Sequence, residues 1–397
     1  MKTKEEILIP NPRELKNHTK KVLKGNTAAA IAAKICRATF VTAYPITPQT
    51  SIIEEIASMI ARGEYDAVSV NMESEHSVFA AIKGASLVGE RVFTATSGQG
   101  LLYAHEVLHA IAHLRLPVVA CNVGRPSYPW NIWCDQSDSL AQRDTGWIQF
   151  YCENSQEVLD TIIQAYFIAE KLHLPVLVVL DAFYVSHTNE NVFIPDQKSV
   201  DAYLPSKING QMDIDIYHPK AFGGLVAPDM YDKFNYLFWE DMNRVEAETN
   251  LAGTKFEKDF GRKYSAVESI NIHSDTKKIL VTLSSITTTV RGVIKDHPEV
   301  GLLKIRLLKP FPRKSILKAL NKVSEDCVLI TVDRNFMGDN EGALLSEIKK
   351  AMYGQTRKIF GVYAGLGGRD VPPATIQKII EIDINSRESG EIVWIDR

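Results

Sequence analysis

Strand-length apolar segments take turns with helix-length segments along two stretches of the chain, and this alternation limits the fold more than any other feature. In the first stretch, strands are expected at 39–44, 67–71, 91–96, 117–123 and 175–181. Helices are expected at 25–37, 49–62, 75–88, 101–114 and 155–171. Such alternation is typical of βαβ units, which form a parallel sheet with helices on both faces. The sequence therefore predicts an α/β fold.

The alternation weakens from about 188 to 275, where the clearest helical pattern lies near 228–249. It then resumes, with strands expected at 278–283, 300–307, 327–332 and 358–362 and helices at 287–296, 313–323 and 341–353. We predict four parts. They are an N-terminal arm (1–24), a larger α/β domain (25–190), a connecting arm with helical segments (191–275) and a smaller α/β domain (276–397).

The composition excludes several classes of protein. Lys and Arg total 45 against 48 for Asp and Glu, so a net charge of −3 gives no attraction to nucleic acid or to an anionic membrane. No apolar run approaches the roughly 18 residues of a membrane span, and residues 1–26 lack the apolar core of a signal peptide. The five cysteines include no C-x-x-C pair, which argues for a reducing cytoplasm and against a resident zinc ribbon or iron–sulfur cluster.

Unusual residues follow four of the expected strands in the first domain. These segments are Tyr44–Pro48, Asn71–Ser77, Thr94–Gly100 and Gly124–Trp130. Because the carboxyl ends of parallel strands meet at one edge of a sheet, their side chains can converge on a ligand. An Arg fork and a Thr hydroxyl, here Arg125 and Thr47, suit a small carboxylate. A carboxylate at the start of a buried helix, Glu73 or Glu75, can hold a protonated heterocycle.

Each of these residues also has a purely structural interpretation. Ser74 can cap its helix, with Glu75 favourable in the first turn. Arg125 can form an ordinary ion pair, and Ser97–Gly100 alone is a weak phosphate-loop signal that does not match G-x-x-x-x-G-K. Only their occurrence together on successive strands favours a functional site.

A second motif suggests a different function. His105, Glu106 and His109 match H-E-x-x-H, the zinc-protease pattern in which two histidines one helical turn apart bind the metal, and His113 continues that face. The pattern has only three fixed positions, and the Gly and third His of its extended form are absent. A helix inside a βα series is also the wrong context, so histidines that pack between helices are the favoured interpretation.

Several motifs, in this order along residues 25–397, resemble the α subunit of 2-oxoacid:ferredoxin oxidoreductases, pyruvate:ferredoxin oxidoreductase above all. In the first domain they are Ala43–Thr50, Glu73–Ser77, Thr94–Leu101, Asn131–Ser139, Arg143–Gln149 and Asp181–Thr188. In the second domain they are Leu307–Pro312, Val332–Asn335 and Ala364–Asp370.

This resemblance implies a thiamine diphosphate enzyme that decarboxylates a 2-oxoacid, transfers the acyl group to coenzyme A and passes electrons through iron–sulfur clusters to ferredoxin. It implies a pyrimidine-binding α/β domain followed by a transketolase C-terminal-like domain. Glu75 would be the carboxylate on the aminopyrimidine ring, where it favours the imino tautomer that activates the thiazolium. Thr47 and Arg125 would hold the substrate carboxylate. The reacting face would be lined by Tyr44, Pro45 and Ile46.

The chain lacks parts that the reaction needs. The diphosphate of the cofactor needs Mg²⁺, which the wider family binds on a G-D-G…N-N motif. No Asn-Asn pair occurs here, and Gly338-Asp339-Asn340 lies in the second domain. We therefore expect no metal on this chain. We expect Mg²⁺ and [4Fe–4S] clusters on partner subunits, namely a diphosphate-binding β, a γ and a ferredoxin-like δ subunit, in a dimer of heteromers.

The substrate follows less directly from the sequence. Pyruvate is the expected 2-oxoacid, but Pro126–Trp130 after Arg125 is bulkier than the small residues of pyruvate-using relatives. A branched-chain or aryl 2-oxoacid, 2-oxoisovalerate or phenylglyoxylate, is therefore an alternative. A non-catalytic α/β scaffold subunit is a further alternative of a different class.

Overall fold

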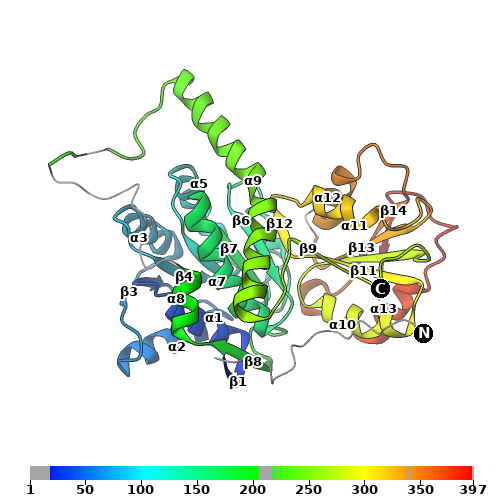
Figure 1. Ribbon diagram of the computed structural model, residues 1–397, viewed down its shortest axis with the longest axis horizontal. Coiled ribbons are helices and arrows are strands. Elements are labelled where there is room, and N and C mark those ends of the chain that lie inside the picture. The colour runs from blue at the N-terminus through cyan, green and yellow to red at the C-terminus, as the bar shows by residue number, and fades with distance from the viewer. Residues whose placement is uncertain (1–17, 205–216, 220, 337, 339–340, 396–397) are drawn as a thin grey trace.

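The computed structural model describes residues 18–204, 217–219, 221–336, 338 and 341–395. Two α/β units lie side by side, a larger one from the N-terminal half and a smaller one from the C-terminal half (Figure 1). All five cysteines are buried and free of disulfides. Within the described ranges, no helix combines the length and the apolar character that crossing a membrane requires.

A seven-stranded sheet forms the centre of the larger unit. Its order is β12–β6–β7–β5–β4–β2–β3, and neighbours are parallel except for β12, which is antiparallel to β6. The strands are β2 (Phe40–Ala43), β3 (Val68–Asn71), β4 (Val92–Thr96), β5 (Val119–Gly124), β6 (Ile148–Cys152), β7 (Val176–Asp181) and β12 (Leu307–Lys309). The predicted parallel sheet is confirmed, although β6 lies where no strand was expected.

Helices cover both faces of this sheet, as the alternation predicts. They are α1 (Gly25–Ile35), α2 (Thr50–Ala61), α3 (Glu75–Leu87), α4 (Gly98–Tyr103), α5 (His105–His113), α6 (Ser137–Leu140) and α7 (Ser155–Leu172). Side chains of β5 alternate between the faces, since Val119 and Cys121 pack in the α1/α2/α7 layer and Ala120 packs in the α3/α5 layer. The helix expected at 101–114 is broken at Ala104, which ends α4 and precedes α5.

The N-terminal arm is a strand over its described part. Strand β1 (His18–Lys24) pairs antiparallel with β8 (Asn189–Pro195) in a separate two-stranded sheet. Residues 1–17 of the predicted arm lie outside the described residues.

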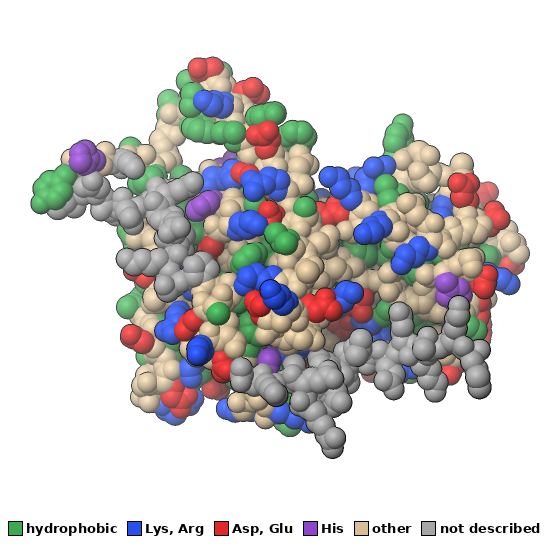
Figure 2. Space-filling model, viewed as in Figure 1, with side chains coloured by type: hydrophobic (Ala, Val, Ile, Leu, Met, Phe, Trp, Pro, Cys, Tyr) green, Lys and Arg blue, Asp and Glu red, His purple; other side chains and the backbone are tan. Residues whose placement is uncertain are grey.

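The connecting segment is dominated by one long helix. After α8 (Gln197–Tyr203) comes α9 (Pro228–Phe260), 33 residues long, which starts with proline at its first position and ends at Gly261 in a left-handed conformation (φ 71°). It therefore runs beyond the helical stretch expected at 228–249. Its C-terminal half packs on α7, and its N-terminal half projects from the body (Figure 1). Figure 2 shows apolar side chains on this projecting end; the exposed ones are Met230, Tyr231, Phe234, Tyr236, Leu237 and Trp239.

The smaller unit has a six-stranded sheet of order β15–β14–β13–β10–β11–β9, with only β9 antiparallel. Its strands are β9 (Val267–Ile270), β10 (Lys278–Thr282), β11 (Val300–Ile305), β13 (Val328–Asp333), β14 (Ile359–Tyr363) and β15 (Ile392–Trp394). One face carries α10 (Ile286–Val293) and α13 (Pro373–Ile380), and the other carries α11 (Arg313–Leu320) and α12 (Ala343–Ala351). Two short 3₁₀ turns complete the unit, η1 (Ile294–Asp296) and η2 (Leu366–Gly368).

The two units are joined by a shared strand and by buried ion pairs. The strand expected at 300–307 divides at Arg306, after which β12 leaves the second sheet and pairs with β6 of the first. Beside this crossing, the Lys304 ammonium lies 2.9 Å from Glu153 and 2.8 Å from Glu157, and all three side chains are almost fully buried. Burial opposes ionisation of Glu153, but Lys304 and Arg291 outweigh it and lower the pKa of this carboxyl to about 2.

Candidate functional site

Three loops follow neighbouring strands at one edge of the larger sheet. Strands β5, β4 and β2 are adjacent and parallel, so their carboxyl ends at Gly124, Thr96 and Ala43 lie on the same side. The loop from β3 into α3 joins them there. The sequence-predicted convergence of these loops is therefore confirmed at the level of topology.

Helix α1 holds the loop after β2 in place through hydrogen bonds. The buried Asn26 amide donates to the Pro48 carbonyl at 2.8 Å and to the Ser51 hydroxyl at 2.8 Å. The Gln49 N–H closes the turn onto the Ile46 carbonyl at 2.8 Å. With the backbone fixed in this way, the loop presents its outer residues to solvent; Ile46 is half-buried, and the exposed ones are Tyr44, Pro45 and Thr47.

Glu75 is the first residue of α3 and points inward. The preceding Ser74 hydroxyl accepts a hydrogen bond from the Ser77 N–H, so the predicted capping role of Ser74 is confirmed. Glu75 is only 8% exposed, and no hydrogen-bond donor among the described residues reaches its carboxylate. The other candidate, Glu73, is exposed and accepts a hydrogen bond from the Ser77 hydroxyl. Of the two carboxylates, only Glu75 is buried and free to accept a donor from a ligand.

Gly100 of α4 makes room for the Glu75 side chain. A methyl group added at Gly100 would lie 2.4 Å from Glu75 Oε1 and 2.7 Å from its Cδ. Real side chains do not approach so closely, so the carboxylate lies directly on the glycine backbone. The glycine-flanked turn after β4 is thus part of the same site as Glu75.

Arg125 directly follows β5 and forms hydrogen bonds with the loop after β2 and with the turn after β4. One guanidinium nitrogen, Nη1, donates to the Thr47 main-chain carbonyl, and Nη2 donates to Gln99 Oε1 at 2.6 Å. The side chain is 5% exposed and packs on Gly98, whose positive φ of 53° and missing side chain both suit the contact. Burial lowers the pKa of Arg125, against the opposing charges of Asp138 and Glu75.

The ordinary ion pair that the sequence left open for Arg125 is not formed. Of the carboxylates in the described part of the chain, none is placed within salt-bridge distance of its guanidinium. The structure therefore brings Arg125 and Thr47 into contact and leaves a buried positive charge beside the exposed loop.

Asp138 organises the site, although no role for it was predicted from the sequence. Its fully buried Oδ2 accepts from the Gly98 N–H at 2.8 Å, the Asn122 amide at 3.0 Å and the Arg125 N–H at 3.2 Å. Burial raises the pKa of Asp138 to about 6, and these hydrogen bonds limit the rise. One carboxylate thus fixes the backbone of the turn after β4 and the start of the loop after β5.

Two protein families match successive parts of the chain. Residues 30–253 match the family described as "Pyruvate flavodoxin/ferredoxin oxidoreductase, thiamine diP-bdg", and residues 276–376 match "Pyruvate:ferredoxin oxidoreductase core domain II". The chain belongs to the 2-oxoacid:ferredoxin oxidoreductase family, as an α subunit. The ketoisovalerate oxidoreductase subunit VorA of Pyrococcus horikoshii is 42% identical over 95% of this chain and 98% of its own length. The pyruvate synthase subunit PorA of Methanothermobacter thermautotrophicus is 41% identical over 94% and 97%.

Solved structures agree with the fold of the α subunit. The 2-oxoglutarate:ferredoxin oxidoreductase from Magnetococcus marinus superposes with a TM-score of 0.70 at 19% identity, over 96% of this chain and 68% of that chain. A split-gene transketolase superposes with a TM-score of 0.51 at 12% identity, over 90% and 93%. The expected combination of a thiamine-diphosphate-type domain with a transketolase C-terminal-like domain is confirmed.

The H-E-x-x-H helix of the α subunit does not form a zinc-protease site. Glu106 is exposed and faces His76, with 3.4 Å between its Oε2 and the His76 Nε2. Across the described ranges, no group of three or more His, Cys, Asp or Glu side chains is arranged to hold a metal ion. A catalytic zinc normally has three protein ligands, so the motif has no support as a peptidase centre.

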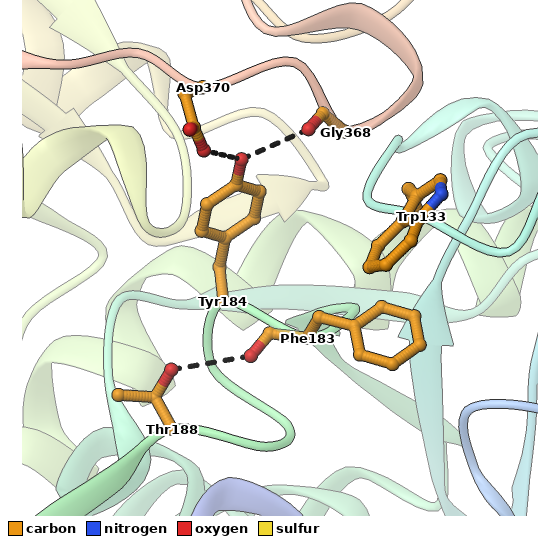
Figure 3. Close-up of a pocket in the computed structure, with 6 residues that line it drawn as sticks. All are labelled: Trp133, Phe183, Tyr184, Thr188, Gly368 and Asp370. Carbon is orange, nitrogen blue, oxygen red and sulfur yellow. Dashed lines mark hydrogen bonds between the residues drawn. The ribbon is translucent and has the colours of Figure 1, made fainter.

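A cavity of about 410 Å³ lies at the junction of the two units of the α subunit, separate from Glu75. Its walls are shown in Figure 3: Trp133, Phe183, Tyr184, Thr188, Gly368 and Asp370. The Trp133 and Phe183 rings lie 4.6 Å apart, and the Tyr184 hydroxyl bonds the Gly368 carbonyl at 3.0 Å and the Asp370 carboxylate. These contacts lock the loop after β7 onto the second unit.

Proposed function

We propose that this α subunit holds the aminopyrimidine end of thiamine diphosphate on Glu75, in a complex that oxidatively decarboxylates a short 2-oxoacid to acyl-CoA and CO₂. Electrons pass to iron–sulfur clusters and then to ferredoxin. The observation that carries this proposal is the Glu75 carboxylate. It is buried, it lies on Gly100, and none of the residues that the structure describes donates a hydrogen bond to it.

The residues present fit the cofactor. A buried carboxylate is costly without a hydrogen-bond partner, and a ring nitrogen that carries a proton supplies one. When bound, the cofactor supplies carbanion chemistry. Glu75 would hold a proton at the ring nitrogen, and Tyr44, Pro45 and Ile46 would line the reacting face of the site.

Arg125 and Thr47 are proposed to hold the substrate carboxylate. A guanidinium has five N–H donors, and the Thr47 carbonyl and Gln99 take two of them. The remaining donors belong to a buried cation that lacks an anionic partner in the described chain. A small carboxylate beside the exposed Thr47 would relieve this imbalance.

Pyruvate is the proposed substrate, with 2-oxoisovalerate as the second candidate because a relative named VorA is 42% identical. The aromatic bulk after Arg125 does not narrow the site in this chain, since Tyr128 is 77% and Trp130 is 61% exposed. An aryl 2-oxoacid therefore has no support from these side chains. Steady-state rates of the purified complex with pyruvate, 2-oxoisovalerate and phenylglyoxylate would discriminate the three.

Partner subunits are proposed to complete the centre. The exposed residues of the loop after β2 leave one side of the site open, and the sequence has no Asn-Asn pair for the diphosphate metal. Asp339 and Asn340 lie outside the described residues. We assign Mg²⁺ and [4Fe–4S] clusters to β, γ and ferredoxin-like δ subunits, coenzyme A to the acyl-transfer step, and the whole to a cytoplasmic dimer of heteromers.

The experiment is Glu75→Gln in the co-purified complex, with Glu73→Gln as a matched control two residues away. Loss of the carboxylate should lower 2-oxoacid-dependent reduction of a viologen dye by on the order of 10³-fold, about 4 kcal/mol, while the subunits still assemble. Glu73→Gln should leave the rate unchanged, because that side chain is in solvent. Near-normal turnover of Glu75→Gln would refute the assignment.

A further inference from the structure

Two histidines of α5 present their ring nitrogens to each other. His105 and His109 are one helical turn apart, and their Nε2 atoms lie 3.4 Å apart. The ring centroids are 4.9 Å apart, with the planes at 84°. Neither side chain belongs to the site around Glu75, and the proposed reaction leaves both unused.

Gln142 sets the tautomer of His105. Its Oε1 lies 2.6 Å from His105 Nδ1, while its own Nε2 donates to the Asp138 carbonyl at 3.3 Å. Because the amide nitrogen is engaged by Asp138, the amide oxygen faces His105 and accepts the Nδ1 proton. His105 Nε2 is then the nitrogen with a free lone pair, and it accepts the proton of His109 Nε2. A metal-bound histidine usually donates its other ring N–H to an acceptor in this way, which fixes its tautomer and orientation.

Two carboxylates act electrostatically on His109. They belong to Asp144 and Glu106, and their negative charges add attraction for a divalent ion.

We propose that His105 and His109 chelate a divalent d-block cation of the Zn²⁺, Ni²⁺ and Cu²⁺ class through their Nε2 atoms. With metal–nitrogen bonds of about 2.1 Å, a separation of 3.4 Å gives an N–metal–N angle of about 108°, close to tetrahedral. The cation replaces the proton between the rings, and His109 moves that proton to its Nδ1. Water completes the coordination, because the described chain supplies two ligands and not three.

The neighbouring histidine provides a matched control. His113 lies one further turn along α5, but its Nδ1 bonds the His109 carbonyl at 3.1 Å and its ring stacks on Phe238 at 5.0 Å. Its ring is therefore engaged by Phe238 and by the His109 main chain. Replacing it removes an imidazole from the same helix and leaves both proposed ligand side chains in place.

The test is isothermal titration of the full-length chain, without a histidine tag, with NiCl₂ at pH 7.5. We expect one equivalent to bind, with at least a ten-fold loss of affinity in both His105→Ala and His109→Ala and no change in His113→Ala. Thermal melting should show a Ni²⁺-dependent rise in Tm for the wild type and His113→Ala only. Absence of binding, or equal affinity in His109→Ala and the wild type, would overturn the proposal.

Discussion

Replacing Gly100 by alanine should disable the site without unfolding the protein. The new methyl group would lie 2.4 Å from Glu75 Oε1, whereas ordinary contact begins at 3.4 Å, so the carboxylate must retreat by 3.4 − 2.4 = 1.0 Å. A displacement of about 1 Å in a catalytic group can cost about 100-fold in rate, or about 2.7 kcal/mol. The backbone itself tolerates the change, because Gly100 lies in a helix without a positive φ.

The assay is kcat/KM of the assembled complex for 2-oxoacid-dependent viologen reduction, together with the Tm of the purified α subunit. Gly84→Ala is the matched control, since Gly84 lies within α3 and an added methyl meets nothing within 4 Å. It should keep full activity and gain up to about 1 kcal/mol from helix propensity. Full activity of Gly100→Ala at an unchanged Tm would show that the position of Glu75 does not matter to the reaction.

Three further predictions concern the contacts that join the two units. Lys304→Met should lower the free energy of unfolding by about 3 kcal/mol in urea, because it removes the buried cation that Glu153 and Glu157 share and leaves them only Arg291 and Arg306 as partners; a loss under 1 kcal/mol would contradict this. The folded-state pKa of Glu153, about 2, lies below its ordinary value of 4.5. Its stabilisation is therefore complete above about pH 5 and lost as the pH falls towards 2, so the difference between wild type and Lys304→Met should shrink over that range in urea titrations. Tyr184→Phe should lower the free energy of unfolding by about 0.5–1.5 kcal/mol through loss of the bonds to Gly368 and Asp370, and an unchanged urea midpoint would count against that role.

Local sequence patterns predicted most of the elements that carry the site. The strand, turn and helix around Ala43–Thr50 fall within a residue or two of their expected bounds, because an apolar run, a proline-rich turn and helical periodicity are all local signals. Strand β6 was missed because its five residues follow a long, mostly irregular segment whose helix α6 is only four residues long. Its pairing with β12 joins Phe150 to Leu307, which are 307 − 150 = 157 positions apart, and no local period encodes such a contact.

The charged residues of the candidate site could be proposed from the sequence, but the residues that hold them in place could not. Glu75 and Arg125 could be proposed because a charged side chain beside a buried strand is costly unless it has a partner. Asp138 lies within the run Asn131–Ser139 that resembles the family, yet its function depends on which N–H groups the fold brings to it. The role of Gly100 likewise depends on a tertiary contact, because the Glu75 side chain lies against its backbone.

The exchange of edge strands has a consequence for how the protein is made. Strand β6 is finished at Cys152, but its neighbour β12 begins at Leu307, which is 307 − 152 = 155 residues later. At about 5–20 residues per second, the ribosome leaves that edge unpaired for on the order of 10 seconds, a period in which an open strand can join a wrong partner. In the second sheet the edge strand is made first. Strand β9 precedes residue 276 and stays unpaired until β11 has been synthesised. A gene divided at that residue would give two fragments, and each would lack an edge strand of its large sheet. The chain is therefore one unit of synthesis although it contains two large sheets.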